Sequence, residues 1–314
     1  MDLAAGVDFG GSSVKVGLVD RKGGIHARET IQIDPRASFE AILDPVVRGL
    51  RRLVGTIEKG GSLAAVGIGT PGFTDTVTGV LVGGCENIPR LRGNSIQAFL
   101  ADALGVPGFA DNDATVAAAG ELLFGAGRIF RNFVLITLGT GIGGGFVLDG
   151  RVYRGARGFA AEIGHLCVDP NGVWCNCGSR GCLEQYASGP AMVRLYGEKA
   201  RKRGAELPAR ALTPKDVVER ASGGDALARD TIEESGRFIA QAFGTILNLL
   251  NLEACIVGGG ISQAGEIVLE PIRRHIGDHC WPLIASGVQV VTAELLNDAG
   301  ILGAAAQAFE RLER

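Results

Sequence analysis

The sequence predicts an α/β protein with two related domains. Apolar runs of strand length alternate with longer segments in which apolar residues recur every three or four positions. A glycine-rich segment near the N-terminus recurs in similar form 129 positions later. The chain has 314 residues, which suffices for two cores of ordinary size. Together these observations indicate two α/β domains, each with a glycine-rich hairpin.

Composition and charge exclude several classes of protein. Hydrophobic residues make up 46% of the chain and charged residues 21%, so it is not intrinsically disordered. A net charge of −3 gives no electrostatic footprint for nucleic acid, and no apolar run has the roughly 18 residues of a membrane span. The N-terminus lacks a signal peptide pattern. We therefore expect a cytoplasmic protein with neither nucleic acid nor a membrane as a partner.

The first half of the chain should form five strands and three helices. Ser38 is the expected N-cap of an amphipathic helix over 39–57. Pro45 either kinks this helix or starts it, because proline suits the first turn of a helix better than its interior. The strands are expected at 4–9, 14–19, 25–33 and 63–70, followed by a helix at 94–104, a fifth short strand at 106–110 and a helix at 113–124.

The second half begins with another buried strand and ends with helices. We expect a strand at 133–139, an irregular loop at 165–182, a helix at 225–251, a strand at 254–260 and a terminal helix at 297–312. The loop at 165–182 is rich in Gly, Cys and Asn and has little periodicity.

The repeated segment is strand, glycine turn, strand in both copies. Residues 8–12 align with 137–141, and Val19-Asp20 aligns with Leu148-Asp149. Because glycine lets backbone N–H groups approach an anion closely, two such turns suit a polyphosphate held between domains. The alternative is a pair of ordinary hairpins. There is no GxxxxGK[ST] loop, and residues 146–153 resemble a strand rather than the helix of a dinucleotide-binding unit, which disfavours NAD.

Two charged residues flank the first turn. Asp8 is a hard oxygen ligand that suits Mg²⁺ through water, although Asp also commonly caps turns. Lys15 either pairs with phosphate or faces solvent from a strand.

A cluster of histidine and cysteine predicts a structural zinc site. The four residues are His165, Cys175, Cys177 and Cys182, separated by loop-forming residues. One imidazole and three thiolates fill the tetrahedron that Zn²⁺ prefers, which leaves no position for a reactive water. The alternative is three unrelated reduced cysteines. The remaining cysteines, 85, 167, 255 and 280, are expected to be buried small hydrophobic residues.

Polar residues in two places suit a hydroxyl-bearing substrate. Asp111, Asn112 and Asp113 lie between a short strand and a helix, where helix capping is the simplest role. The alternative is a carboxylate that accepts the proton of an acceptor hydroxyl in phosphoryl transfer. Around the cysteine cluster, Glu162, His165 and Glu184 either line a pocket or lie at the surface.

The motifs, in order along the chain, resemble the ROK family of repressors, open reading frames and sugar kinases. They are VDFGGSSVKVGLVD (7–20), GTPG (69–72), DNDA (111–114), LGTGIGGG (138–145), GARGFAAEIGH (155–165), CNCGSRGCLE (175–184) and IVGGG (256–260). The resemblance implies an actin-like, ribonuclease H-like ATPase fold with two α/β domains and a cleft between them. It places residues 1–120 and 297–314 in a smaller domain and 121–296 in a larger domain that carries the zinc loop.

The resemblance also implies an ATP- and Mg²⁺-dependent hexose kinase and assigns roles by motif position. Asp113 resembles the catalytic base. The sugar-binding positions are Gly72, Asn112, Asp113, Glu162, His165 and Glu184, and the zinc ligands are His165, Cys175, Cys177 and Cys182. The ATP-binding positions are Asp8, Gly10, Gly11, Ser12, Lys15, Gly139, Thr140, Gly141, Gly143, Gly144, Gly259 and Gly260.

Sugar identity and assembly stay open at this point. Glucose is the first expectation for the acceptor, and N-acetylglucosamine, N-acetylmannosamine and fructose are alternatives. ATP is the expected donor, with polyphosphate not excluded, and the family implies a homodimer or homotetramer. A catalytically silent sugar-sensing regulator is the alternative from another class. The motifs begin at residue 7, so no N-terminal DNA-binding domain is expected. Asp111 departs from the family pattern, and its charge is expected to raise the pKa of Asp113.

Overall fold

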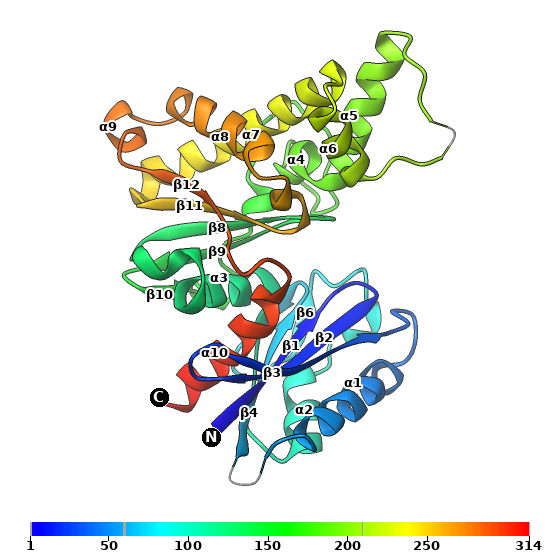
Figure 1. Ribbon diagram of the computed structural model, residues 1–314, viewed down its shortest axis with the longest axis vertical. Helices are drawn as coiled ribbons and strands as arrows, with labels where there is room; N and C mark the ends of the chain where they lie inside the picture. The colour runs from blue at the N-terminus through cyan, green and yellow to red at the C-terminus, as the bar shows by residue number, and fades with distance from the viewer. Residues whose placement is uncertain (1, 59–60, 209, 314) are drawn as a thin grey trace. The chain divides into compact units, whose positions relative to one another are not determined.

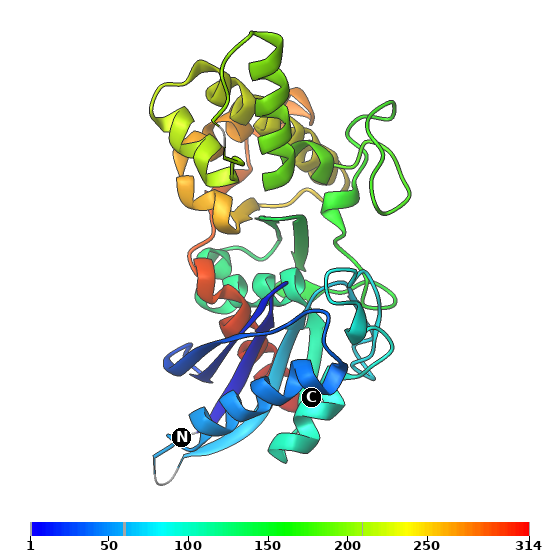
Figure 2. The same cartoon turned by 90° about the vertical axis from the view of Figure 1, so that its right-hand side faces the viewer.

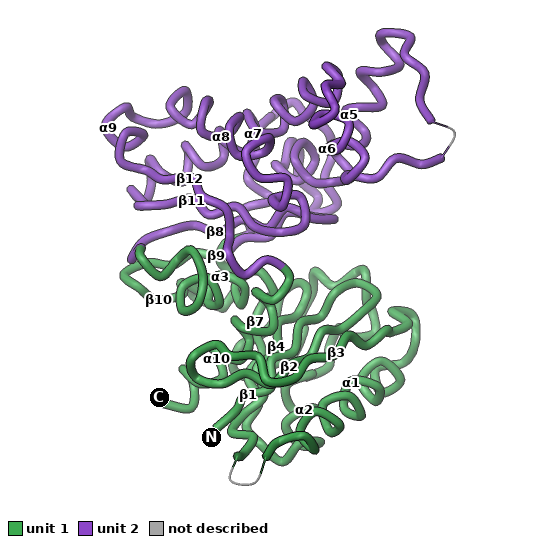
Figure 3. Tube along the Cα trace, viewed as in Figure 1, with its two compact units in different colours: residues 1–129, 145–161, 297–314 green, residues 130–144, 162–296 purple. Residues whose placement is uncertain are grey.

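The computed structural model describes residues 2–58, 61–208 and 210–313. The chain forms two compact units (Figure 3). Unit 1 comprises Met1–Ile129, Gly145–Ala161 and Asn297–Arg314, and unit 2 comprises Phe130–Gly144 and Glu162–Leu296. The sequence-based division differs from these units at 121–129 and 145–161, which it grouped with the larger domain. Both units are mixed α/β.

A five-stranded sheet forms the centre of unit 1, with the order β3-β2-β1-β4-β7. Its strands are β1 (Asp2–Phe9), β2 (Ser13–Asp20), β3 (Ile25–Gln32), β4 (Ser62–Thr70) and β7 (Gly108–Asn112). The first three strands pair antiparallel through short turns, whereas β4 runs parallel to both β1 and β7. In parallel pairs the carboxyl ends meet at one edge, so Asp8, Thr70 and Asn112 end their strands at the same side of the sheet.

The second five-stranded sheet has the order β10-β9-β8-β11-β12. Its strands are β8 (Phe133–Leu138), β9 (Ile142–Leu148), β10 (Arg151–Tyr153), β11 (Ala254–Gly258) and β12 (Gln289–Thr292). β9 and β10 pair antiparallel, and β11 runs parallel to β8 and β12. This order repeats that of the first sheet strand for strand, in agreement with the repeat that the sequence indicated.

The two faces of β1 explain how helices cover the first sheet. Leu3, Ala5, Val7 and Phe9 belong to the core that also contains residues of α1 (Phe39–Val54) and α2 (Ile96–Leu104). Because side chains alternate along a strand, Gly6 lies on the other face, where α10 (Ala299–Leu312) packs. A Cβ on Gly6 would be 2.1 Å from the Ile301 carbonyl oxygen. Figures 1 and 2 show α10 on one face and α1 and α2 on the other.

Glycines also allow the close packing of α3 (Asp113–Phe124) in unit 1. A Cβ on Gly303 of α10 would be 1.8 Å from the Val116 carbonyl oxygen of α3. A Cβ on Gly145 would be 2.5 Å from the Ala118 side chain. The segment that starts at Gly145 therefore packs on α3, which is the physical reason that 145–161 group with unit 1.

Most of the α-helices among the described residues belong to unit 2. They are α4 (Glu184–Ala187), α5 (Gly189–Lys202), α6 (Pro214–Ser222), α7 (Ala226–Leu250), α8 (Glu266–His275) and α9 (Pro282–Ala285). Asp225 caps the start of α7, and Asn251 ends it in the left-handed conformation. Gly236 brings α7 against α8, since a Cβ there would be 2.5 Å from that of Pro271.

Several local expectations can be checked directly. Ser38 caps α1 by accepting a hydrogen bond from the Ala41 amide. The helix starts at Phe39 and continues through Pro45, so the alternative in which Asp44-Pro45 starts it is wrong. β7 covers 108–112 rather than 106–110, because its ladder with β4 continues to the pair of Thr70 with Asn112. Within the described chain, the helices are too short or too polar to span a bilayer.

Candidate active site

The turn between β7 and α3 holds Asn112 and Asp113. The Asn112 Oδ1 accepts hydrogen bonds from the amides of Ala114 (3.0 Å) and Thr115 (3.1 Å), so Asn112 is the N-cap of α3. Its Nδ2 donates to the Gly72 carbonyl oxygen at 3.1 Å. Asp113 occupies the first turn of α3, where the peptide dipoles favour a negative charge. The capping role is therefore confirmed for Asn112, and the same turn presents the Asp113 carboxylate.

Gly72 is at a position that only glycine fits. Its φ is +74°, and a Cβ would lie 2.4 Å from the Gly83 carbonyl oxygen and 2.5 Å from that of Gly84. This backbone conformation orients the Gly72 carbonyl that accepts the Asn112 amide.

Gly72→Ala is expected to lower the free energy of unfolding by more than the roughly 1–2 kcal/mol that a left-handed alanine costs, because steric overlap adds to that cost. Gly105→Ala is the matched control, since Gly105 has a φ of +69° with no atom within 4 Å of the new Cβ. Urea denaturation of both variants measures the difference. Equal losses of unfolding free energy in the two variants would mean that the loop around Gly72 shifts to accommodate the new Cβ. The loop would then not hold Asn112 in place.

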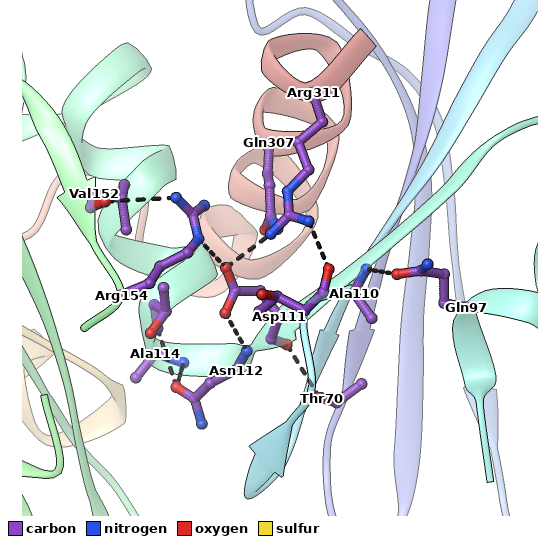
Figure 4. Close-up of polar contacts among 12 residues, drawn as sticks. Thr70, Gln97, Ala110, Asp111, Asn112, Ala114, Val152, Arg154, Gln307 and Arg311 are labelled. Atoms are coloured by element: carbon purple, nitrogen blue, oxygen red, sulfur yellow. Dashed lines mark hydrogen bonds and ion pairs between the residues drawn. The ribbon is translucent and has the colours of Figure 1, made fainter. Parts of the chain in front are cut away.

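Asp111 pairs with an arginine that the sequence did not suggest. The Asp111 carboxylate is fully buried and accepts a hydrogen bond from the Arg154 Nε at 2.6 Å (Figure 4). The expected effect of Asp111 on the pKa of Asp113 stays a prediction. The sequence contained no local signal for this pair, because 43 positions separate the two residues.

The first glycine turn connects β1 to β2 in unit 1. The Gly10 amide donates to the Ser13 carbonyl oxygen at 2.9 Å, and Gly10, Gly11 and Ser12 are exposed. No atom lies within 4 Å of a Cβ built on Gly11, so the backbone of this turn is open to a ligand. Lys15 lies opposite Asp8 in the hairpin, with its Nζ 4.0 Å from an Asp8 oxygen and 3.1 Å from the Asn297 carbonyl oxygen.

Asp8 ends β1 next to the first residues of α10. Burial raises the pKa of the Asp8 carboxyl above its ordinary value, and the Lys15 ammonium lowers it in part. A Cβ on Gly300 would be 2.4 Å from the Asp8 Cγ, so glycine is needed there to accommodate the carboxylate. The Asp8 carboxylate is a hard oxygen ligand of the kind that Mg²⁺ prefers, so this residue could hold the ion.

The raised pKa of Asp8 predicts a pH-dependent stability. The native state holds this proton more tightly than the unfolded chain does, so the free energy of unfolding should fall as pH rises from about 4 through the raised pKa. Asp8→Asn should remove that part of the fall, whereas Asp44→Asn, at an exposed position on α1, should not. Urea denaturation in metal-free buffer across this range tests it, and parallel curves for parent and Asp8→Asn would contradict it.

The second glycine turn connects β8 to β9 in unit 2. The Gly139 amide donates to the Gly141 carbonyl oxygen at 3.0 Å, and the Gly139 carbonyl accepts the Gly189 amide at 2.9 Å. The Glu184 Oε2 accepts the Ile142 amide at 3.0 Å, which ties the turn to the start of α4. The sequence predicted a glycine turn over 139–144, but the observed turn is shorter, because Gly143 and Gly144 belong to β9.

A cavity of about 520 Å³ in unit 2 brings the second turn and the third glycine motif together. Gly139, Thr140 and Gly260 all line it. Gly259 has a φ of +85°, and a Cβ there would be 2.4 Å from the Leu138 carbonyl oxygen, so this motif packs on the end of β8. Sequence reasoning missed the rest of the lining, which comes mainly from α6 and the turn after β11: Thr213, Pro214, Lys215, Val218, Glu219, Ile261, Gln263 and Ala264. No motif identifies these residues.

Glu162 and His165 lie together at the start of the loop that follows. Their Oε2 and Nε2 atoms are 3.9 Å apart. Burial raises the pKa of the Glu162 carboxyl, the His165 imidazole lowers it, and the Glu184 carboxylate raises it further. The three residues that the sequence grouped around the loop therefore act on one another electrostatically. Gly164 fixes this turn against β9, because a Cβ there would be 2.2 Å from the Ile142 carbonyl oxygen.

His165, Cys175, Cys177 and Cys182 offer ligand atoms that all lie within 4.8 Å of one another. The Cys177 and Cys182 sulfurs are 3.5 Å apart, and the Cys175 sulfur is 3.6 Å from the His165 Nδ1. A tetrahedron with Zn–S bonds of 2.3 Å has edges of about 3.8 Å. The donor set and its spacing thus fit one structural Zn²⁺. The two ring nitrogens of His165 face different partners, with Nδ1 toward the cysteines and Nε2 toward Glu162.

Cys167 departs from the expectation of burial. Cys85, Cys255 and Cys280 are buried, but Cys167 is exposed. The backbone of Cys167 forms an isolated antiparallel β-bridge with that of Cys182, and both thiols are free. The Cys182 side chain is buried, whereas that of Cys167 is exposed.

Comparison with known proteins identifies relatives that match nearly the whole chain. The ROK family matches residues 4–311. A glucokinase of Thermotoga maritima is 38% identical over 317 residues, which cover 98% of this chain and 97% of that protein. The crystal structure of a ROK family glucokinase from Streptomyces griseus in complex with glucose and AMPPNP is 35% identical, has a TM-score of 0.81, and covers 98% of this chain and 99% of its own.

A xylose repressor of Bacillus spizizenii is more distant, at 27% identity over 95% of this chain and 74% of the repressor. The solved kinases have the actin-like ATPase fold, which this chain shares as two α/β units. The match over 308 consecutive positions, 4–311, includes every motif described above. The chain belongs to the ROK family.

Proposed function

We propose that this protein is an ATP-dependent hexose kinase and that its acceptor is glucose, phosphorylated at the 6-hydroxyl. The observation that carries the proposal is the turn in which Asn112 caps α3 and Asp113 follows in the first helical turn. Two relatives that are 38% and 35% identical over nearly the full length are named glucokinases, which supports glucose over the N-acetylhexosamines and fructose.

Asp113 is the proposed general base. Its carboxylate takes the proton of the 6-hydroxyl, and the hydroxyl oxygen bonds to the γ-phosphorus of ATP. The bond between that phosphorus and the oxygen it shares with the β-phosphate breaks, so ADP leaves and the proton returns from Asp113 to water. Asn112, through its Nδ2, and the Gly72 segment hold the sugar on unit 1, and Glu162, His165 and Glu184 supply hydroxyl-binding groups on unit 2.

The two glycine turns are the proposed phosphate-binding groups. Gly10, Gly11 and Ser12 of unit 1 and Gly139, Thr140 and Gly141 of unit 2 would donate N–H groups to phosphate oxygens. The nucleoside would occupy the 520 Å³ cavity of unit 2 near Gly260. Lys15 adds a positive charge, and Asp8 would hold Mg²⁺, which neutralises charge that develops on the phosphates.

The zinc site has a structural role in this proposal. Zn²⁺ would supply a fixed crosslink for His165, Cys175, Cys177 and Cys182. The His165 Nδ1 faces the cysteines and its Nε2 faces Glu162, so a fixed His165 would orient both side chains for a sugar hydroxyl.

We also propose that the protein forms a homodimer or homotetramer. Unit 2 exposes large apolar side chains near the end of α7 and on α9, among them Leu249, Trp281 and Leu283, with exposed fractions of 77%, 74% and 87%. Such clusters commonly lie in interfaces. Sedimentation equilibrium measures the assembly, and a monomer at micromolar concentration would contradict this proposal.

An ADP-release assay over a panel of hexoses and N-acetylhexosamines tests the function, with ATP and polyphosphate as alternative donors. We expect the highest kcat/KM with glucose and ATP. A higher value for N-acetylglucosamine, N-acetylmannosamine or fructose would change the acceptor but keep the kinase. Saturable sugar binding without ADP release would instead favour a sugar-sensing regulator.

A further inference from the structure

Asp111 is a fully buried carboxylate immediately before the catalytic turn. Three donors surround it, and each comes from a different part of unit 1 (Figure 4). Its Oδ2 accepts from the Arg154 Nε at 2.6 Å and from the Gln307 Nε2 at 3.2 Å. Its Oδ1 accepts the Asn112 amide at 2.9 Å. The carboxylate therefore joins the end of β10, helix α10 and the Asn112 backbone.

The arrangement requires Arg154. A carboxylate that is buried without a partner is strongly destabilising. Arg154 is itself mostly buried, with 17% of its side chain exposed, so solvent screens this pair little. Arg154 therefore compensates the burial of the carboxylate that also accepts the Asn112 amide.

The cluster is not optimised for stability. The Arg154 Nη2 and the Gln307 Oε1 are buried without a hydrogen-bond partner among the described residues. Each such group is destabilising, because it has lost its hydrogen bonds to water and gained none in return. Buried polar groups that are retained at this cost are expected where a site needs a fixed geometry rather than where a core needs only packing.

The contacts hold both sides of one peptide group. The Asp111 side chain accepts the Asn112 amide, and the Thr70 hydroxyl donates to the Asp111 carbonyl oxygen at 3.1 Å. Asn112 in turn caps α3, whose first residue is Asp113. A rotation of the 111–112 peptide would therefore move the amide and carboxylate that the proposed function uses.

We propose that Asp111, paired with Arg154, is a positioning residue that fixes the Asn112–Asp113 turn for phosphoryl transfer. This inference rests on the proposed function, because it assigns the turn the same chemistry. Asp111 itself touches no substrate in this account. Gln307 is a third member of the set, and it ties the turn to the C-terminal helix across 196 positions of sequence.

The charged groups near Asp111 identify the contact to test. Arg154 follows β10, and Arg311 lies on α10 beside the cluster (Figure 4). Asp113 begins α3, two residues after Asp111. Thr70 on β4 and Gln307 on α10 are neutral. Arg154 forms the ion pair with the Asp111 carboxylate, so it is the residue to replace.

Arg154→Met is the main test. A misplacement of ~1 Å costs up to about 10²-fold, so we expect kcat to fall about tenfold or more while the KM for ATP stays within about twofold. Asp111→Asn combined with Arg154→Met should lower kcat little further than Arg154→Met alone, because both substitutions remove the same pair.

Arg151→Met is the matched control, since Arg151 lies three residues earlier on β10 and is exposed. It should keep the parental kcat. Arg154→Lys keeps the positive charge but not the planar donor, so it should lose less kcat than Arg154→Met. This variant also tests the proposal if Arg154→Met does not fold. A parental kcat in Arg154→Met, or in Arg154→Lys where Arg154→Met does not fold, would overturn the inference.

Hydrogen exchange of the Asn112 amide separates this inference from the proposed function. Arg154→Met should speed the exchange of that amide, and Arg151→Met should not. If the parent phosphorylates no sugar but the exchange changes as expected, the kinase proposal fails and the positioning contacts stand. If the parent is a kinase and exchange is unaltered in Arg154→Met, the positioning role is wrong.

Discussion

Asp113→Asn is expected to lower kcat by about 10²-fold or more while glucose affinity and folding stay near their parental values. The amide cannot accept the hydroxyl proton. It keeps an oxygen that can accept the Ala114 amide, which Asp113 Oδ1 receives at 2.8 Å, so the first turn of α3 should remain intact. Steady-state ADP release measures kcat, and glucose binding by calorimetry measures affinity in the same preparation.

Asp102→Asn is the control for a change of charge on unit 1, because Asp102 is exposed on α2. It should leave kcat unchanged. An Asp113→Asn variant that turns over at nearly the parental rate would show that another group takes the proton. A variant that loses glucose binding as completely as turnover would assign Asp113 to binding rather than to catalysis.

Removal of zinc is expected to weaken glucose binding by about tenfold or more. Without the crosslink, His165 and Glu162 lose their fixed orientation, and the loss of one or two hydrogen bonds of about 1 kcal/mol each corresponds to a change of this size. Elemental analysis should find about one zinc ion per chain in the parent. Cys177→Ala should reduce that content, lower the melting temperature and raise the KM for glucose more than the KM for ATP.

Cys167→Ala is the matched control for this prediction, since Cys167 lies in the same loop outside the ligand cluster. It should retain zinc and the parental KM for glucose. Metal-free protein with an unchanged glucose affinity would break the proposed link between the metal and the sugar-binding residues.

Local sequence features predicted much of the fold and part of the site. Strand alternation and helix periodicity located to within two residues most of the elements for which they gave bounds, although several helices of unit 2 had no predicted bounds. The Asn112 cap follows from its residue type before an apolar helix. The short-range cysteine spacing located the four candidate zinc ligands. Such features depend on neighbours in the chain, which a single sequence displays directly.

Contacts between distant segments were not predictable in the same way. In the sequence alone, Asp111 is indistinguishable from a helix-capping residue. Only the folded chain brings Arg154 and Gln307 into contact with it. The α6 lining of the unit 2 cavity has no motif, because apolar and mixed side chains there follow the helix pattern that any surface helix shows. The grouping of 145–161 with unit 1 depends on Gly145 packing against Ala118, which no periodicity reveals.

A crystal structure with bound glucose tests the central claim most directly. The measured quantity is the distance from the Asp113 carboxylate to the sugar hydroxyl oxygens. The account predicts that the 6-hydroxyl lies within about 3 Å of that carboxylate, as a proton acceptor requires. Glucose bound away from Asn112, or an Asp113 carboxylate that faces a different hydroxyl or none, would contradict it.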